Sequence, residues 1–425
     1  MQVRRRGFSE IDRDQMATKE TIEPLTGLRG IAALLVVHSH YFFWCAPYTT
    51  ESIPRHLLNA SNTANFGMSL FFTLSGFVIT YHYWNFGWRE SPAAAFFRFL
   101  FLRLSRLYPV FLLFFLLQFK STSIDGDFYG DRWFSAALIH VFNLESWYPI
   151  QFKNALVDGS GYFVSWSIST EIGMYLIFAT ALVLAGRFTR RVGPVLAATA
   201  TIYVALTVVA VNFNDTVGPA LARLPNVYDA LEPNYAWRWF YYLSPYFRLT
   251  QFIFGAFAAM LVLKEWDVGL RFHLSNLSTI SAALILVLYI DVIVSGKISP
   301  ETSQLLQSAL FAIMMANGRA NTLLNRALSN KALVFFGLIS YSLYLFHRYP
   351  ATWAGASQVK EFTWPLFGQY AFNFCLTLLF AAILSWGLYS TIEMPAQKWL
   401  RTMLPRRWKE TAAPAADAPI QPVRA

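Results

Sequence analysis

The stretch Leu25–His40 reads LTGLRGIAALLVVHSH, an apolar run with a guanidinium near its start and an imidazole at its end. Together with the residues that follow, it approaches the roughly 20 apolar residues that a helix needs to cross a membrane. Arg29 and His40 are eleven residues apart. That is about three helical turns, so the two side chains share a face, with a rise of about 16 Å between them. The stretch predicts a membrane helix with Arg29 at one edge and His40 near mid-membrane.

The composition of the whole chain agrees with a membrane protein. Hydrophobic residues make up 56% of its 425 residues and charged residues 14%, whereas a soluble domain carries about 25% charge. The mean hydropathy is +0.39. We therefore expect an all-α, polytopic transmembrane bundle of about ten spans. These spans are expected near residues 28–46, 66–84, 100–119, 163–186, 194–212, 244–264, 274–294, 302–318, 333–353 and 367–390.

The distribution of basic residues predicts the orientation. Residues 131–148 are fairly apolar but carry four ionisable side chains, so we interpret them as an interfacial or re-entrant piece rather than a span. With ten spans and a cytoplasmic N-terminus, every basic cluster lies on the cytoplasmic side, as is typical of membrane proteins. An eleventh span would place the later clusters outside. Both termini are therefore expected in the cytoplasm.

The chain is expected to divide into a cytoplasmic N-terminal segment (1–24), a transmembrane domain (25–400) and a cytoplasmic, largely disordered Ala/Pro-rich tail (401–425). No cleavable signal peptide is expected. The net charge of +10 does not indicate nucleic-acid binding, because the basic residues lie in short clusters between apolar blocks, as in the cytoplasmic loops of membrane proteins. Cys45 and Cys375 lack metal or redox spacing, so no metal site is predicted.

Ionisable groups inside spans cost a few kcal/mol unless they face a partner or a cavity. Besides Arg29 and His40, three sets share a helical face by their spacing of three or four residues. They are Arg103 with Arg106; Ser167 with Glu171 and Tyr175; and Ser340 with Tyr344 and His347.

Each set also has a structural interpretation. The arginines can be ordinary anchors at the membrane edge, and the His, Glu and Tyr residues can bond neighbouring helices. Arginine forks nevertheless suit phosphate, and a buried carboxyl group needs a partner or a proton.

Six motifs, in this order along the chain, resemble the acyltransferase 3 family of membrane acyltransferases. They are LTGLRGIAALLVVHSH, with Arg and His separated by ten residues; NFGMSLFFTLSGFVI; RLSR; VSWSISTEIGMYL; ISYSLYLFH; and Ile392-Glu393-Met394-Pro395. They extend over nearly the whole chain. Thr26, Ser69 and Ile172 stand where many family members have an acid, which puts a role for those acids in doubt.

The resemblance implies a membrane O-acyltransferase. The donor would be acyl-CoA, with acetyl-CoA as the default, and no cofactor would be permanently bound. The acceptor would be a hydroxyl of a glycan, a glycolipid or a glycosylated small molecule, and lipopolysaccharide, exopolysaccharide and macrolide sugars all remain open. The expected location is the bacterial inner membrane. A transporter or flippase of a glycan is the alternative, because intramembrane polar residues also line substrate pathways.

The resemblance and the spacing together suggest a role for each residue. Arg29, Arg103 and Arg106 would bind the donor's phosphates, and His40 would deprotonate the acceptor hydroxyl. Glu171 would orient that imidazole and stabilise the imidazolium. Transient acylation of His40 stays open as an alternative to direct transfer. The expected substrate-binding residues are Trp166, Ser167, Tyr175, Tyr344 and His347.

Overall fold

The structure is a computed structural model of the chain. It describes residues 22–45, 63–84, 88, 91–124, 133–148, 151–152, 155–156, 164–188, 192–213, 217, 219, 237, 239–263, 268–294, 298, 300–351 and 366–405. The N-terminal segment up to residue 21 and the tail from residue 406 lie outside these described residues, as does the side chain of Cys45.

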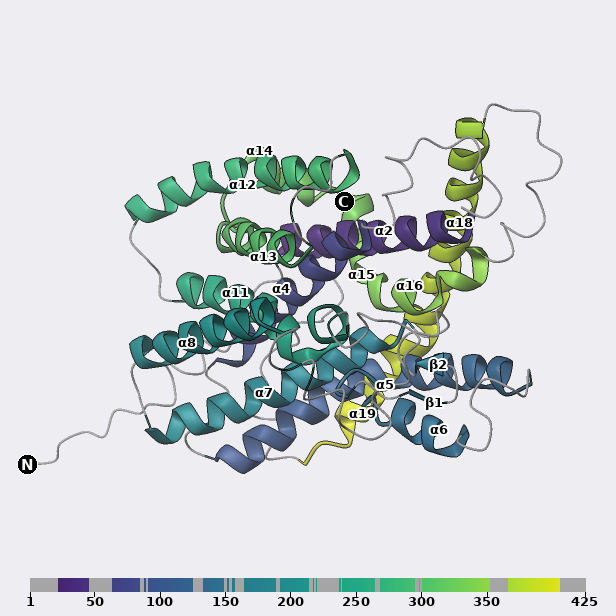
Figure 1. Cartoon of the computed structure of the whole chain (residues 1–425), viewed down its shortest axis with the longest axis horizontal. Helices are drawn as coiled ribbons and strands as arrows, with labels where there is room; N and C mark the ends of the chain where they lie inside the picture. Colours follow the sequence, from purple (N-terminus) through teal and green to yellow (C-terminus); the bar gives the residue numbers. More distant parts are fainter. Residues whose placement is uncertain are drawn as a thin grey trace, which may run out of the picture.

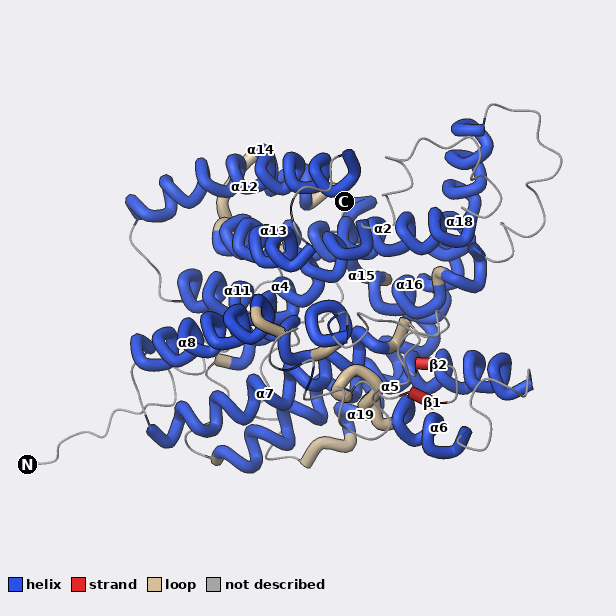
Figure 2. Tube along the Cα trace, viewed as in Figure 1, coloured by secondary structure: helices blue, strands red, loops and turns tan. Residues whose placement is uncertain are grey.

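The described chain is a bundle of α-helices with one short β-hairpin (Figures 1 and 2), so the expectation of an all-α fold is confirmed. The hairpin pairs β1 (Gln151–Phe152) with β2 (Ala155–Leu156). Two π-helices are present among the described residues: η4 (Trp239–Leu243) precedes α11, and η5 (Tyr389–Glu393) joins α18 to α19. The α-helices are α2 (Glu23–Cys45), α4 (Thr63–Tyr83), α5 (Pro92–Ile124), α6 (Trp133–Val141), α7 (Trp166–Phe188), α8 (Val192–Val211), α11 (Pro245–Leu263), α12 (Val268–Val294), α13 (Pro300–Ala316), α14 (Leu323–Leu328), α15 (Lys331–Leu338), α16 (Ser340–Phe346), α18 (Leu366–Leu388) and α19 (Met394–Thr402).

Several of these helices can cross a membrane. Within the described residues, five stretches are long and apolar enough: Thr63–Tyr83, Pro92–Gln118, Trp166–Leu184, Trp239–Leu263 and Tyr370–Thr402. Shorter apolar helices lie at Ala200–Val209, Leu277–Asp291 and Thr302–Ala316. Together they cover the predicted spans near 66, 100, 163, 194, 244, 274, 302 and 367. The total of ten spans and the position of both termini remain predictions.

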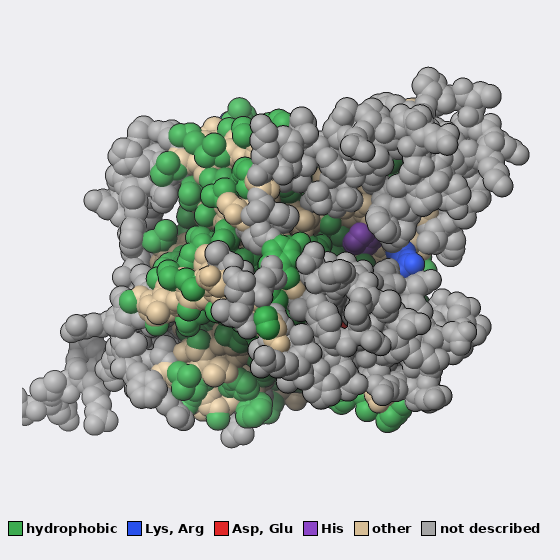
Figure 3. Space-filling view, viewed as in Figure 1, with side chains coloured by type: hydrophobic (Ala, Val, Ile, Leu, Met, Phe, Trp, Pro, Cys, Tyr) green, Lys and Arg blue, Asp and Glu red, His purple; other side chains and the backbone are tan. Residues whose placement is uncertain are grey.

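Large apolar side chains point outward from the bundle. The face in Figure 3 shows mostly hydrophobic side chains among the described residues. Such a surface is unfavourable in water and suits the lipid phase. The outward residues on α12 are Leu277, Ile280, Leu284, Leu286, Val287 and Ile290, and those on α18 are Phe372, Leu379, Phe380, Ile383 and Trp386.

The structure differs from the predicted element boundaries in two places. The predicted span at 333–353 is not one continuous helix, because the chain breaks at Ile339 between α15 and α16. The helix that carries Arg103 and Arg106, α5, begins at Pro92 rather than near residue 100, and its first turns have the sequence PAAAFF. Residues 131–148 contain a nine-residue helix, α6, followed by turns. Nine residues cannot cross the hydrocarbon core.

Helix α4 lies at the centre and packs against α2, α11 and α13. The contact between α4 and α11 is close because glycines face backbone on both sides. A Cβ at Gly76 would collide with the Phe252 carbonyl, and a Cβ at Gly255 would collide with the Thr73 carbonyl. Helices α2 and α15 approach each other in the same way. Small residues allow this close packing in membranes, where the hydrophobic effect contributes little to helix association.

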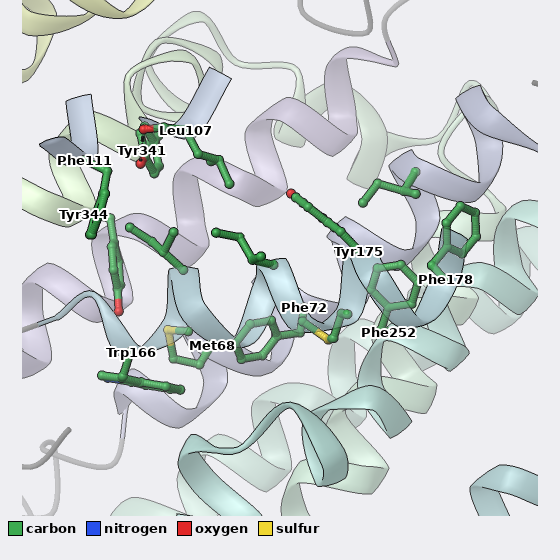
Figure 4. Packing of buried hydrophobic residues seen from close by; sticks show 14 of the residues in the cluster. Met68, Phe72, Leu107, Phe111, Trp166, Tyr175, Phe178, Phe252, Tyr341 and Tyr344 are labelled. Atoms are coloured by element: carbon green, nitrogen blue, oxygen red, sulfur yellow. Dashed lines mark hydrogen bonds between the residues drawn. The ribbon is translucent and has the colours of Figure 1, made fainter. Parts of the chain in front are cut away.

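Aromatic residues from α4, α5, α7, α11 and α16 form the main buried cluster (Figure 4). Trp166 and Tyr175 of α7 are members, together with Tyr341 and Tyr344 of α16. In Figure 4 the Tyr344 hydroxyl points toward Trp166. Phe72 of α4 belongs to the same cluster, so residues of three of the six motifs meet in one part of the bundle.

We predict that Gly255→Leu destabilises the protein, because the new side chain forces α4 and α11 apart. Overpacking typically costs about 1–3 kcal/mol, and here the collision is with backbone. Thermal unfolding in detergent, followed by tryptophan fluorescence, should show a lower melting temperature. Gly387→Leu on α18 is the matched control, since a Cβ there meets nothing within 4 Å. Equal melting temperatures for the two variants would contradict this packing.

Candidate active site

Two histidines from distant parts of the chain meet. His40 Nδ1 lies 2.8 Å from His347 Nε2, across a sequence separation of 307 residues. His40 comes from the C-terminal half of α2, and His347 follows the last turn of α16. Ala33 and Val37 of α2 pack with Leu343 of α16 and hold the two helices together. His347 is fully buried and His40 is half-buried, so His40 is the more accessible imidazole.

Three side chains of the ISYSLYLFH motif fix α16 in this position. Tyr341 donates a hydrogen bond to the Leu107 carbonyl of α5, at 2.7 Å. Ser342 donates to the carboxylate of Glu393 in η5, also at 2.7 Å. The third, Tyr344, donates to the Val164 carbonyl at 2.8 Å. The ISYSLYLFH motif and Glu393 of η5 therefore fix the position of His347.

The polar stripe of α7 faces the interior, as its spacing predicts. The Ser167 hydroxyl lies 2.8 Å from the Tyr344 hydroxyl. One turn further, Glu171 Oε1 accepts hydrogen bonds from Ser75 of α4, at 2.9 Å, and from the Tyr175 hydroxyl. The stripe thus links α7 to α4 and α16.

The two arginines of the RLSR motif are buried inside the bundle. Arg103 is 4% exposed and Arg106 is 8% exposed. Arg103 donates to the Tyr175 hydroxyl at 3.3 Å, and its guanidinium lies 5.2 Å from the centroid of that ring and 5.9 Å from that of Tyr83. An anchor at the membrane edge keeps its charged end in water. The burial of both arginines therefore argues against the anchor interpretation.

These contacts form a series from one end of the site to the other. Arg103 contacts Tyr175, which contacts Glu171. One helical turn away on α7, Ser167 contacts Tyr344, whose backbone carbonyl accepts a hydrogen bond from His347 at 2.7 Å. His347 in turn contacts His40.

One expected relationship, between Glu171 and His40, differs from what the structure shows. The hydrogen bonds of Glu171 to described residues go to Ser75 and Tyr175, and the imidazole of His40 bonds His347 instead of Glu171. Arg29 lies half-buried on α2, on a different helix from Arg103 and Arg106. The spacing of residues along a helix predicts which face they share but not which helix that face meets.

Sequence reasoning missed Arg248, the fourth residue of α11. Its side chain is 0% exposed. It donates through Nε to the Tyr242 carbonyl at 2.7 Å and through Nη1 to Gln304 at 3.1 Å. The guanidinium lies 4.7 Å from the ring centroid of Tyr242 and 5.9 Å from that of Trp166. An arginine inside the predicted span 244–264 was the available signal.

Arg248 acts on the site through Trp166. A guanidinium over an aromatic face is attracted to the ring, and the π-helix η4 directs the Tyr242 carbonyl toward the same guanidinium. Arg248 therefore contacts the residue that directly precedes Ser167, whose hydroxyl contacts Tyr344. π-Helical turns are frequent at functional sites.

The comparisons with known proteins give one match. No curated protein and no solved structure matches the chain. A family model described as an acyltransferase domain, of the acyltransferase 3 type, matches residues 23–386. This match extends from the start of α2 almost to the end of α18, and it includes every predicted site residue. The protein is therefore a membrane acyltransferase that transfers acyl groups other than amino-acyl groups, and the chain belongs to the acyltransferase 3 family.

Proposed function

We propose that the protein transfers an acyl group, with acetyl as the default, from acyl-CoA to a hydroxyl of a carbohydrate or glycosylated acceptor. The observation that carries this proposal is that α7 connects two groups of contacts: Tyr175 contacts Arg103, and Ser167 contacts Tyr344, which leads to the His347–His40 pair. An acyl-CoA has the same two-part chemistry, with phosphates at one end and a thioester at the other. Because the chain belongs to an acyltransferase family, we assign its intramembrane polar residues to acyl transfer rather than to the substrate pathway of a transporter.

The donor's phosphates are assigned to the arginines. Arg103 and Arg106 are one turn apart on α5 and buried, so their charges act in a low dielectric, where attraction to an anion is strong. A guanidinium can bond two phosphate oxygens at once. Arg29 lies on the same face of α2 as His40, three turns away, and completes the proposed donor path.

His40 is assigned the role of general base in the acyl transfer. A neutral imidazole can accept the proton of the acceptor hydroxyl while its oxygen attacks the thioester carbonyl. The proton then passes to the leaving thiolate, so CoA leaves as the thiol. Transient acylation of His40 remains the second route. Glu171 lies one helical turn from Ser167, which contacts Tyr344, and we assign its carboxyl group the stabilisation of the imidazolium.

The acceptor is assigned to the Tyr344 side of the site. Ser167 and Tyr344 pair their hydroxyl groups there, and Trp166 precedes Ser167 on α7; we assign the hydroxyl groups of the acceptor to this polar cluster. Tyr175 connects this region to Arg103. The same proposal places the enzyme in a bacterial inner membrane, with segments 1–24 and 401–425 in the cytoplasm and the domain 25–400 in the bilayer.

We predict that His40→Ala lowers acyl transfer by at least about 10²-fold, because general base catalysis contributes that much or more. Membranes containing the full chain are incubated with radiolabelled acetyl-, succinyl- or isovaleryl-CoA, and label in the glycan and glycolipid fractions is counted. His38→Ala is the matched control: His38 is on the same helix, but its imidazole contacts Tyr370 and Phe374. Normal transfer by the His40 variant, or equal loss in the control, contradicts the assignment.

We predict that Arg103→Ala and Arg106→Ala each raise the KM for acyl-CoA by about tenfold or more, because a hydrogen bond to a charged group contributes about 1.5–3 kcal/mol. Steady-state kinetics in proteoliposomes measure the KM for donor and acceptor separately. Arg326→Ala on α14 is the control, since Arg326 is exposed and bonds Asn321. A change confined to the acceptor KM would exclude the phosphate-binding role.

A further inference from the structure

We propose that His347 is a positioning residue that fixes the tautomer of His40, so that the lone pair of His40 lies on Nε2. This inference rests on the proposed function of His40 as the base. It assigns His347 a role different from the substrate binding suggested by its sequence motif. The argument needs only the hydrogen bonds of the two imidazoles.

The two rings meet edge to edge. Their planes differ by 6°, their centroids are 5.0 Å apart, and the facing nitrogens are 2.8 Å apart. Face-to-face rings with nitrogens this close would have much closer centroids. The rings therefore lie in nearly one plane, with the two nitrogens between the centroids. A lone pair on an imidazole nitrogen lies in the ring plane, so this is the geometry of an N–H···N hydrogen bond.

The contacts of His347 Nδ1 show which nitrogen of this ring carries the proton. Nδ1 lies 2.7 Å from the Tyr344 carbonyl and 3.1 Å from the Leu343 carbonyl. A carbonyl oxygen accepts hydrogen bonds and cannot donate, so Nδ1 carries a proton. His347 is the C-cap residue of α16, where side chains commonly bond the last carbonyls of a helix. The helix end itself thus sets the tautomer of His347.

The tautomer of His40 follows. In a neutral His347 with its proton on Nδ1, Nε2 carries a lone pair and accepts. His40 Nδ1 must then be the donor, and His40 Nε2 carries the lone pair. The reverse arrangement would place a lone pair of His347 Nδ1 against two carbonyl oxygens, where all three atoms are acceptors. The backbone of α16 thereby specifies which nitrogen of His40 acts as the base.

The hydrogen bond between the two imidazoles also stabilises His40 when His40 is protonated. When His40 Nε2 takes the proton of the acceptor hydroxyl, the bond from Nδ1–H to His347 is kept and becomes charge-assisted, which strengthens it. The acceptor oxygen forms a bond to the thioester carbon, the carbon–sulfur bond breaks, and the proton on Nε2 passes to the thiolate. His347 gains and loses no proton during this cycle. A buried imidazole thus performs the orienting task that a carboxylate performs in a catalytic triad.

Two substitutions separate this role from a purely structural one. In His347→Gln, the amide oxygen can occupy the place of Nε2 and accept from His40. In His347→Asn, the shorter amide can keep the bond to the α16 carbonyls but does not reach His40. We expect kcat to fall by about 10²-fold in the Asn variant and by less than about tenfold in the Gln variant, with the KM for acyl-CoA unchanged in both. The variants are compared at equal amounts of folded protein in proteoliposomes. The donor is the acyl-CoA that the radiolabel transfer assay identifies.

The outcomes distinguish the inference from the proposed function. If the Asn variant retains more activity than the Gln variant, or if the two retain equal activity, His347 does not set the tautomer of His40. In that case, loss of activity in His40→Ala would leave the proposed function intact. An active His40→Ala variant would overturn both.

A second measurement uses the unaltered protein. Its histidine ring nitrogens are labelled with ¹⁵N, the full chain is placed in lipid nanodiscs, and the His40 signals are assigned by their loss in His40→Ala. We expect the chemical shifts of a ring protonated on Nδ1. Protonation on Nε2 alone would overturn the inference, whatever the substitutions do.

Discussion

An ionisable side chain inside a bilayer is costly unless the protein supplies a partner, and this constraint shapes the described part of the molecule. Buried arginines lie over tyrosine and tryptophan rings, the Glu393 carboxylate bonds a serine, and the His40 imidazole bonds a second imidazole. The lipid-facing surfaces of α12 and α18, in contrast, present large apolar residues. Polar chemistry is thereby confined to the interior of the bundle.

Close helix packing makes these internal contacts possible. The glycines of α4 and α11 bring backbone against backbone, and Ser75 on the same helix α4 bonds Glu171 of α7. The break at Ile339 ends α15 and starts a separate helix, α16, which ends at His347. A site for acyl transfer needs both properties: a rigid frame, and a helix end that directs a side chain toward the reacting group.

Much of the fold followed from the sequence, because membrane spans depend on local hydropathy. The family followed from motifs, because six of them occur in the order typical of the family and extend over nearly the whole chain. The shared faces of Arg29 with His40 and of Ser167 with Glu171 depend only on helical spacing. The His40–His347 contact did not follow, because it joins helices whose packing is set by distant residues. Arg248 was missed for another reason: its aromatic partners Trp166 and Tyr242 belong to separate segments.

The central claim is that a donor's phosphates bind at Arg103 and Arg106 while its thioester reaches His40. The most direct measurement is a cryo-electron microscopy structure of the protein with a stable ether analogue of acyl-CoA. The account predicts phosphate oxygens within hydrogen-bond distance of both guanidiniums, and the analogue's sulfur-equivalent atom beside His40 Nε2. Phosphates bound elsewhere, or an acyl end separated from His40 by packed side chains, would contradict it.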